Sequence, residues 1–246
     1  GRWRGPGAAK DLMMLGPFDY ALWLIGFLLE IFVVVCALYK RDFVRYFPLI
    51  FYMMCEALVT LGQFYCVHTA GFNSLSYVYY YYYTDSLLTI LMFWVVIKFY
   101  HEVFDEMQVG RYIRGSAILI LALTAIFSFA VVHQNQNHLT SRFVVELGQN
   151  LYFVGVVLTY VLWGAIMKLR ETRTRLIQLV LALGVYFSAT AGTYALRNLF
   201  PQIELPLLKS IFPIVGLWLP LAWAYTFMKV PENARLLTAE LAVRTR

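Results

Sequence analysis

Long apolar stretches alternate with short polar connections along the chain of 246 residues. A bilayer core of ~30 Å is crossed by a helix of about 20 apolar residues, and in lipid each backbone polar group needs a partner within its own segment. The pattern therefore predicts an all-α protein, a polytopic membrane bundle of seven transmembrane helices. The expected spans cover residues 18–39, 43–67, 76–104, 116–132, 143–167, 176–199 and 205–228.

Lysine and arginine are unevenly distributed between the connections of these predicted helices. With these spans, 14 of the 20 basic residues fall on one side of the membrane and 6 on the other. Basic residues accumulate in short loops on the inner side of a membrane, so we expect the amino-terminus outside and the carboxyl-terminus inside. Residues 1–17 are then an outer tail and residues 18–229 the transmembrane domain. Residues 230–246 are an inner tail, either a short interfacial helix or a frayed end.

The composition supports membrane insertion. Hydrophobic residues make up 61% of the chain and charged residues 14%, whereas soluble domains carry roughly 25% charged residues. The net charge of +6 is explained by inner loops that face anionic lipid. No nucleic-acid recognition motif accompanies it, so the lipid bilayer is the expected partner, with other membrane protein subunits as a second possibility.

Two glutamates are expected near the middle of spanning helices, Glu30 in the first and Glu56 in the second. An ionisable side chain at that depth costs ~2.5–3.5 kcal/mol on insertion scales and usually faces the interior of the bundle. The pair is therefore a candidate proton or ion path.

Other polar residues are expected in the outer half of the membrane, where they would line a cavity that opens outward. Arg197 or Lys209 is expected to pair with Asp85 or Glu146, because a lone charge in a low dielectric is costly. The alternative is that these groups only form hydrogen bonds and a salt bridge that hold the bundle together. The candidate cavity residues are Asp85, Glu146, Gln149, Asn150, Thr193, Arg197 and Lys209.

Small residues follow a helical spacing on the sixth predicted helix, at Gly184, Ser188 and Gly192. Small side chains let two helix backbones approach closely in a membrane. This face is expected to pack against another helix.

No motif for catalysis, nucleotide binding or metal binding is present in the sequence: HExxH, GxSxG, the P-loop and GxGxxG all fail to match. We therefore expect no cofactor, no metal and no enzymatic activity. The first functional hypothesis is a non-enzymatic membrane subunit or scaffold that packs with other membrane proteins. The alternative is a small carrier or ligand-sensing bundle that uses the outer polar cavity and the pair Glu30 and Glu56.

Three segments resemble uncharacterised seven-helix membrane proteins of bacteria. They are FDYALWLIGFLLE at residues 18–30, the tyrosine-rich segment that ends in KFYHEVF at residues 98–104, and KLRETRTRL at residues 168–176. The resemblance brings no known activity and no known functional residues. It implies a bacterial inner membrane as the location.

Overall fold

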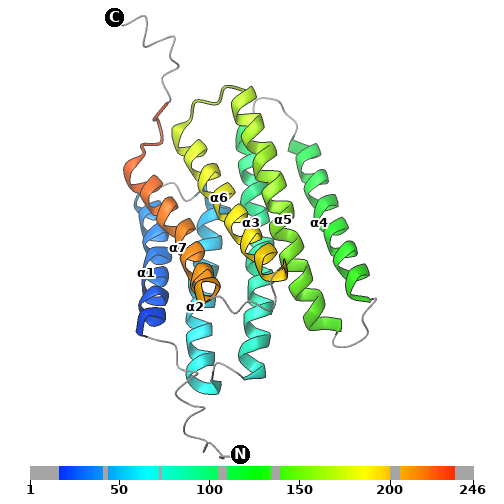
Figure 1. The fold of residues 1–246 in the computed structure, drawn as a ribbon. Coiled ribbons are helices and arrows are strands. Elements are labelled where there is room, and N and C mark those ends of the chain that lie inside the picture. The colour runs from blue at the N-terminus through cyan, green and yellow to red at the C-terminus, as the bar shows by residue number, and fades with distance from the viewer. Residues whose placement is uncertain are drawn as a thin grey trace, which may run out of the picture.

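The computed structural model describes residues 17–40, 44–71, 74–104, 110–133, 139–199 and 206–235. The fold class is all-α, as the apolar pattern predicted. Successive helices run in opposite directions, so α1 begins at the lower end of the molecule in Figure 1 and α7 ends at the upper end. The helices are α1 (Pro17–Tyr39), α2 (Phe47–Ala70), α3 (Leu75–Val103), α4 (Gly110–His133), α5 (Leu139–Lys168), α6 (Thr174–Leu199) and α7 (Pro206–Lys229).

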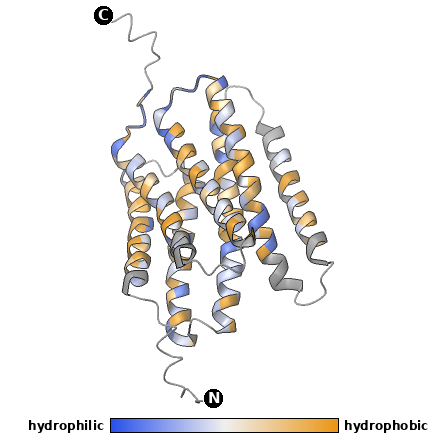
Figure 2. Ribbon diagram, in the orientation of Figure 1, coloured by the Kyte–Doolittle hydropathy of each residue, from blue (hydrophilic) through white to orange (hydrophobic). Residues whose placement is uncertain are grey.

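Five of the helices, α1, α2, α3, α5 and α6, are long and apolar enough over their described residues to cross a membrane. Their outward surfaces are also apolar: Leu28, Leu58 and Val157 are each more than half exposed. In Figure 2 hydrophobic residues cover most of the helices, and hydrophilic ones gather in the connections at the upper end. A surface this apolar is stable against lipid rather than water. The chain is thus a multi-pass membrane protein.

Local sequence signals set the ends of α2 and the start of α3. Pro48 lies in the first turn of α2, where its fixed φ fits a helix and its missing N–H leaves no donor unpaired. Gly71 follows the last turn of α2 with a φ of 84°, a value that favours glycine. The Ser74 side chain accepts a hydrogen bond of 3.1 Å from the N–H of Tyr77, and so caps α3.

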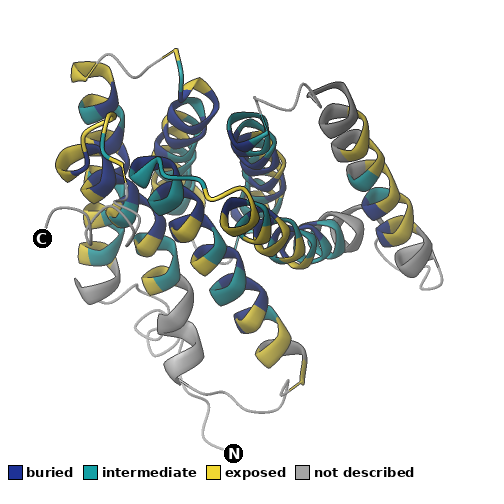
Figure 3. Cartoon of the chain, turned by 90° about the horizontal axis from the view of Figure 1, so that it is seen from above, coloured by how far each residue is buried: buried dark blue, intermediate teal, exposed yellow. Residues whose placement is uncertain are grey.

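Six helices pack in a closed order: α1, α2, α3, α5, α6 and α7 each contact the next, and α7 returns to α1. Helix α4 packs on α5, with a smaller contact to α3, and lies at the edge of the bundle in Figures 1 and 3. The described side chains of α4 are largely exposed, whereas the other helices turn buried faces toward one another (Figure 3). The interior of the protein is therefore the space that these six helices enclose.

Aromatic side chains fill much of this interior. Tyr52, Phe93, Phe187 and Trp223 are among the largest fully buried side chains. Phe93 of α3 meets Phe187 of α6 edge to face at 6.2 Å between ring centroids, and Tyr52 of α2 meets Trp223 of α7 at the same distance. Such pairs contribute ~0.5–1.5 kcal/mol beyond the area that they bury, so they hold non-neighbouring helices in register.

The small residues of α6 lie in different surroundings. A Cβ added at Gly184 would lie 3.7 Å from the Cβ of Thr159 on α5, an ordinary contact. Ser188 donates a hydrogen bond of 2.8 Å to the carbonyl of Gly184 within its own helix. A Cβ at Gly192 would meet no atom within 4 Å in the described part of the chain. Helix α5 thus approaches α6 closely at Gly184, whereas no described residue lies close to Gly192.

Among the described glycines, the two with the least room for a side chain lie on α2 and α5 rather than on α6. A Cβ added at Gly155 would overlap the ring of Phe187, and one added at Gly62 of α2 would overlap the hydroxyl of Tyr80 on α3. Glycine is needed at both positions because a neighbouring aromatic side chain occupies the space of a methyl group. These two glycines were not among the packing residues that the sequence predicted.

Candidate functional site

Glu30 lies in α1 and is only 6% exposed. The hydroxyl of Thr60 on α2 donates a hydrogen bond of 3.4 Å to its Oε2 atom. Gly26, one turn earlier on α1, faces α7: a Cβ there would lie 3.2 Å from Leu217 and 4.0 Å from Oε1 of Glu30. The carboxyl group is thus held inside the bundle, as its mid-helix position predicted.

Glu56 lies in the same region, on α2, and is half-buried as a residue. Its Oε2 atom is buried and has no hydrogen-bond partner. The hydroxyl of Tyr52, one helical turn earlier, interacts with the carboxyl group. Glu30 and Asp85 are both near enough for their charges to act on it. An unpaired buried carboxyl oxygen is costly, and Glu56 is the one acid among the described residues that has such an oxygen.

Asp85 sits where α3 packs on α5. The hydroxyl of Tyr152 donates a hydrogen bond of 3.4 Å to its Oδ1 atom. A Cβ added at Gly148 of α5 would lie 3.7 Å from Oδ2, an ordinary contact, so this carboxyl oxygen faces α5. The carbonyl of Asp85 also accepts a hydrogen bond of 2.8 Å from Thr89 on the next turn.

Tyrosine rings surround these acids. The ring of Tyr152 lies 6.3 Å from that of Tyr186 and 5.6 Å from that of Tyr194, both on α6. Tyr186 is near enough to Glu56 for an electrostatic interaction. One turn along α6, Thr190 is 4% exposed and its hydroxyl has no hydrogen-bond partner. The rings thus lie around Glu56 and Asp85, and the hydroxyl groups of Tyr52 and Tyr152 reach these two acids.

Three carboxyl groups, from α1, α2 and α3, thus share one buried region that we call the carboxyl cluster: Glu30, Glu56 and Asp85. None of the ion pairs among the described residues includes any of the three. The described residues also contain no group of three or more His, Cys, Asp or Glu side chains that could hold a metal ion. Ionised carboxylates without a counter-charge cost several kcal/mol in such surroundings. Binding of a proton or another positive species would lower this cost.

The other residues of the expected outer cavity do not all join this cluster. Asn150 donates a hydrogen bond of 2.9 Å to Ser128 and so faces α4. The Thr193 hydroxyl donates a bond of 2.7 Å to Ala189 in its own helix. Glu146 is half-buried, and none of the described hydrogen bonds or ion pairs joins it to Asp85.

Gln149 is also half-buried on α5. The side chains of Arg197 and Lys209, residues 1–16 and residues 236–246 lie outside the part of the chain that the structure describes. The expected pairing of Arg197 or Lys209 with Asp85 or Glu146 therefore stays a prediction.

Sequence analysis did not single out Tyr52 or Tyr152 as neighbours of the cluster. Tyr52 precedes Glu56 by four residues, a spacing that puts both side chains on one helix face, so this neighbour could have been found. Tyr152 reaches Asp85 from another helix, and no local spacing reveals that contact.

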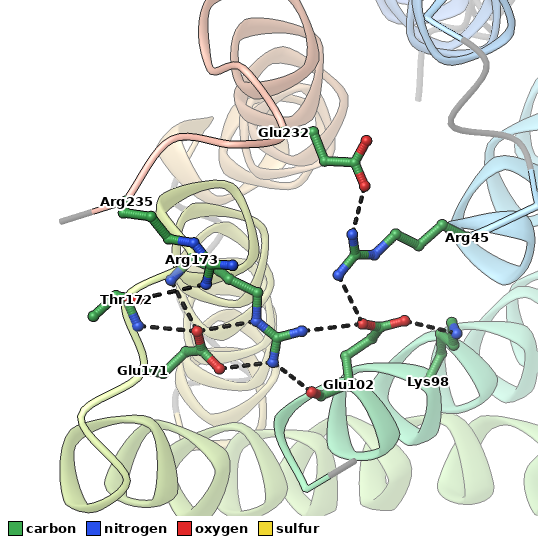
Figure 4. A network of polar contacts seen from close by, with 8 residues as sticks. All are labelled: Arg45, Lys98, Glu102, Glu171, Thr172, Arg173, Glu232 and Arg235. Carbon is green, nitrogen blue, oxygen red and sulfur yellow. Dashed lines mark hydrogen bonds and ion pairs between the residues drawn. The ribbon is translucent and has the colours of Figure 1, made fainter. Parts of the chain in front are cut away.

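A second polar feature lies at the upper end of the bundle, where α3 ends and α6 begins (Figure 4). Glu102 accepts hydrogen bonds from Arg45 at 3.1 Å and Arg173 at 3.3 Å, and pairs with Lys98 at 2.9 Å. Arg45 pairs in addition with Glu232, which follows α7. These residues form the upper-end network, in which each acid has at least one cationic partner.

Arg173 also binds Glu171 within the connection between α5 and α6, at 2.7 Å. The hydrogen bonds from Arg173 lower the pKa of the Glu171 carboxyl below its ordinary value, because they stabilise the ionised form. The pKa of Arg173 is raised by the same partner.

No family model, curated protein or solved structure matches the chain. A function must therefore be argued from the site and its chemistry.

Proposed function

We propose that the chain is a small membrane carrier or ligand-sensing bundle whose carboxyl cluster takes up and releases protons or a monovalent cation. The observation that carries this proposal is the buried Oε2 atom of Glu56, which lacks a hydrogen-bond partner beside Glu30 and Asp85. Purely structural polar groups in a membrane interior pair with one another. An unpaired acid next to two further acids is instead suited to a positive species that arrives and leaves.

Protonation or cation binding would change the charge repulsion between α1, α2 and α3, the helices that carry the three acids. A ligand that binds one arrangement of these helices better than another shifts the equilibrium between them. This coupling supports either transport, where the site opens alternately to each side, or sensing, where the altered arrangement is read by another protein.

Thermal stability in lipid nanodiscs tests the proposal. We expect the melting temperature of the unmodified protein to depend on pH between 5 and 9, or on the concentration of sodium, potassium or a small ammonium ion. A cation at 100 times its Kd adds ~2.7 kcal/mol of stability. Glu56→Gln should lose most of this dependence, and Glu146→Gln, which changes a half-buried acid on α5, should keep it.

A melting temperature that varies with neither pH nor any of these cations would contradict the proposal, as would an unchanged dependence in Glu56→Gln. Reconstitution into liposomes with a pH-sensitive dye inside then separates the two forms of the proposal. A carrier dissipates an imposed gradient and Glu56→Gln does not, whereas a sensor shows the stability effect without flux.

For the topology, we propose that all seven helices span the bilayer, with the amino-terminus outside and the carboxyl-terminus inside a bacterial inner membrane. The support is the accumulation of basic residues at one end of the bundle, among them Arg45, Lys168 and Arg173. An impermeant thiol reagent added to whole cells should label Ser74→Cys and spare Glu171→Cys. Labelling of both from the same side would refute this topology.

A second candidate function is a subunit or scaffold of a larger membrane complex. A surface groove of ~680 Å³ between α5 and α6 favours it, with Gly164, Gly184 and Ser188 in its walls. Small residues at this spacing fit a transmembrane helix of a partner protein. Native purification with mass measurement should then give a complex rather than a monomer, and Gly164→Leu should release the partner.

A further inference from the structure

The segment after α7, residues 230–235, folds back over the upper end of the bundle. It forms a turn and then pairs with the connection between α5 and α6, where Arg173 and Arg235 make an antiparallel bridge. The N–H of Thr174 donates a hydrogen bond of 3.1 Å to the carbonyl of Ala234. We call this segment the strap.

The base of the strap is anchored by a buried arginine. Arg175 on α6 is 2% exposed and donates two hydrogen bonds, of 3.0 and 2.7 Å, to the carbonyl of Val230. Its guanidinium group also lies 5.6 Å from the ring centroid of Phe227 on α7, a cation–π distance. A buried cation needs such partners, so the start of the strap is fixed to α6.

The middle of the strap is tied to the opposite side of the bundle by Glu232. Glu232 pairs with Arg45 just before α2, and Arg45 pairs in turn with Glu102 at the end of α3. Arg173 joins the same Glu102 from the α5–α6 connection and donates a further bond of 2.6 Å to its backbone carbonyl. Figure 4 shows Glu102 between the two arginines, with Glu232 beyond Arg45. Three chain segments that are distant in sequence are therefore joined to one another and to the strap.

These ties differ in strength. The Arg175 anchor is buried, whereas the side chains of Arg45 and Glu232 are 35% and 42% exposed. Exposed ion pairs contribute ~0–1 kcal/mol and are screened by salt. The tie through Glu232 is therefore weaker than the anchor at the base of the strap.

Beneath the strap lies an apolar layer that separates it from the carboxyl cluster. Tyr46 and Phe227 pack edge to face at 5.6 Å, and Met53, fully buried on α2, lies three residues before Glu56. We propose that the strap is a latch. When the strap is docked, it closes the upper end of the bundle over this layer. When the Arg45–Glu232 ion pair breaks, the strap is released and that end opens toward the carboxyl cluster. This device goes beyond the proposed function, since it rests on the geometry of the strap alone.

The experiment uses the full-length protein in nanodiscs with two readouts. The first is the rate at which a maleimide labels a single reporter cysteine, Met53→Cys, after Cys36, Cys55 and Cys66 have been changed to serine. The second is hydrogen exchange of the Thr174 amide in the protein with its native cysteines, because that amide bonds the strap. Neither readout depends on cation binding, so failure of the latch and failure of the proposed function can be told apart.

Glu232→Gln removes the tie and should raise both rates about two- to fivefold. The matched control is Lys98→Gln, which removes a cation from the same Glu102 but only an ion pair inside α3, and should change neither rate. The latch is overturned if Glu232→Gln leaves the reporter rate unchanged, whether or not Thr174 exchanges faster. It is also overturned if Lys98→Gln raises the reporter rate as much.

Discussion

The carboxyl cluster and the upper-end network contain the same kind of residue in opposite states of pairing. Glu102 in the network has three cationic partners within 3.3 Å. Glu56 in the cluster has an oxygen atom without any partner, and the nearest charged groups are two more acids. The first arrangement stabilises the structure that is present, whereas the second would be stabilised by a positive species, as the proposed function requires.

The pairing of each acid, rather than its depth in the membrane, distinguishes the structural role of Glu102 from the role proposed for Glu56. Removal of a paired acid lowers the free energy of unfolding of the protein, because its cationic partners are left without an acceptor. Replacement of an unpaired buried acid by an apolar side chain raises the free energy of unfolding of the protein, because the cost of desolvating the acid disappears. One substitution made in both regions should therefore have effects of opposite sign.

The largest effect is expected for Glu102→Met. The Glu102 side chain is 14% exposed, and its loss leaves Arg45, Lys98 and Arg173 without their shared acceptor. We expect the free energy of unfolding to fall by about 2 kcal/mol. This value lies between the ~3–5 kcal/mol lost when a buried ion pair is broken and the ~0–1 kcal/mol lost for an exposed one. Unfolding by SDS in mixed micelles measures it, and Glu102→Gln, which keeps one acceptor oxygen, should lose less. A change below ~0.5 kcal/mol, the size of an ordinary exposed pair, would show that the network does not stabilise the bundle.

The same substitution in the cluster, Glu56→Met, should raise the free energy of unfolding by about 1 kcal/mol, because an unpaired buried acceptor costs ~1–3 kcal/mol and methionine fills a similar volume. Mixed-micelle unfolding at neutral pH without added alkali cations measures the change. Glu146→Met, at a half-buried site, is the control and should lie near zero. Destabilisation by Glu56→Met would show that Glu56 is structurally paired and would remove the basis of the contrast.

The sequence predicted the helices well, because a membrane requires long apolar segments and leaves few alternatives. The ends were harder to predict. Residues 43–67 were expected for the second helix, but α2 begins at Phe47, since Pro48 favours the first turn of a helix. Residues 116–132 were expected for the fourth helix, but α4 spans Gly110–His133, because polar turns that continue a helix beyond the apolar segment do not register as hydrophobic.

The candidate site was predictable only in part. The depths of Glu30 and Glu56 follow from their positions along apolar helices, and both lie inside the bundle. Periodicity does not show which helix packs against each helix face. Asn150 shares a face of α5 with Glu146, yet Asn150 donates a hydrogen bond to Ser128, because α4 packs on that side of α5.

Long-range pairs left no local signal at all. Glu102 resembles any charged residue near a helix end, and Glu232 is 187 positions from Arg45. Only the closed order of the helices brings these side chains together.

A smaller effect is expected for Tyr152→Phe, which removes the hydroxyl that donates to Asp85. The loss of one hydrogen bond should lower stability by about 1 kcal/mol and alter the pH or cation dependence of the melting temperature, because Asp85 loses its donor. Tyr100→Phe is a matched control, since Tyr100 donates a bond of 2.7 Å to the carbonyl of Leu158 between the same two helices. It should cost a similar amount and leave the dependence unchanged; equal changes in both variants would remove Asp85 from the site.

The smallest effect concerns Glu171 and acid pH. Because Arg173 lowers the pKa of this carboxyl, its contribution is fully present above the ordinary glutamate pKa of ~4.3 and is lost as the pH falls through the lower pKa of the folded protein. Glu171→Gln should therefore melt below the unmodified protein by a constant margin, worth up to ~1 kcal/mol, from pH 7 down to about pH 5. The margin should then shrink as the pH falls further, in melting curves recorded at pH 7, 5, 4 and 3. If it instead grows toward low pH, Glu171 binds its proton more tightly in the folded protein than in the unfolded chain, and the pairing with Arg173 does not stabilise this connection.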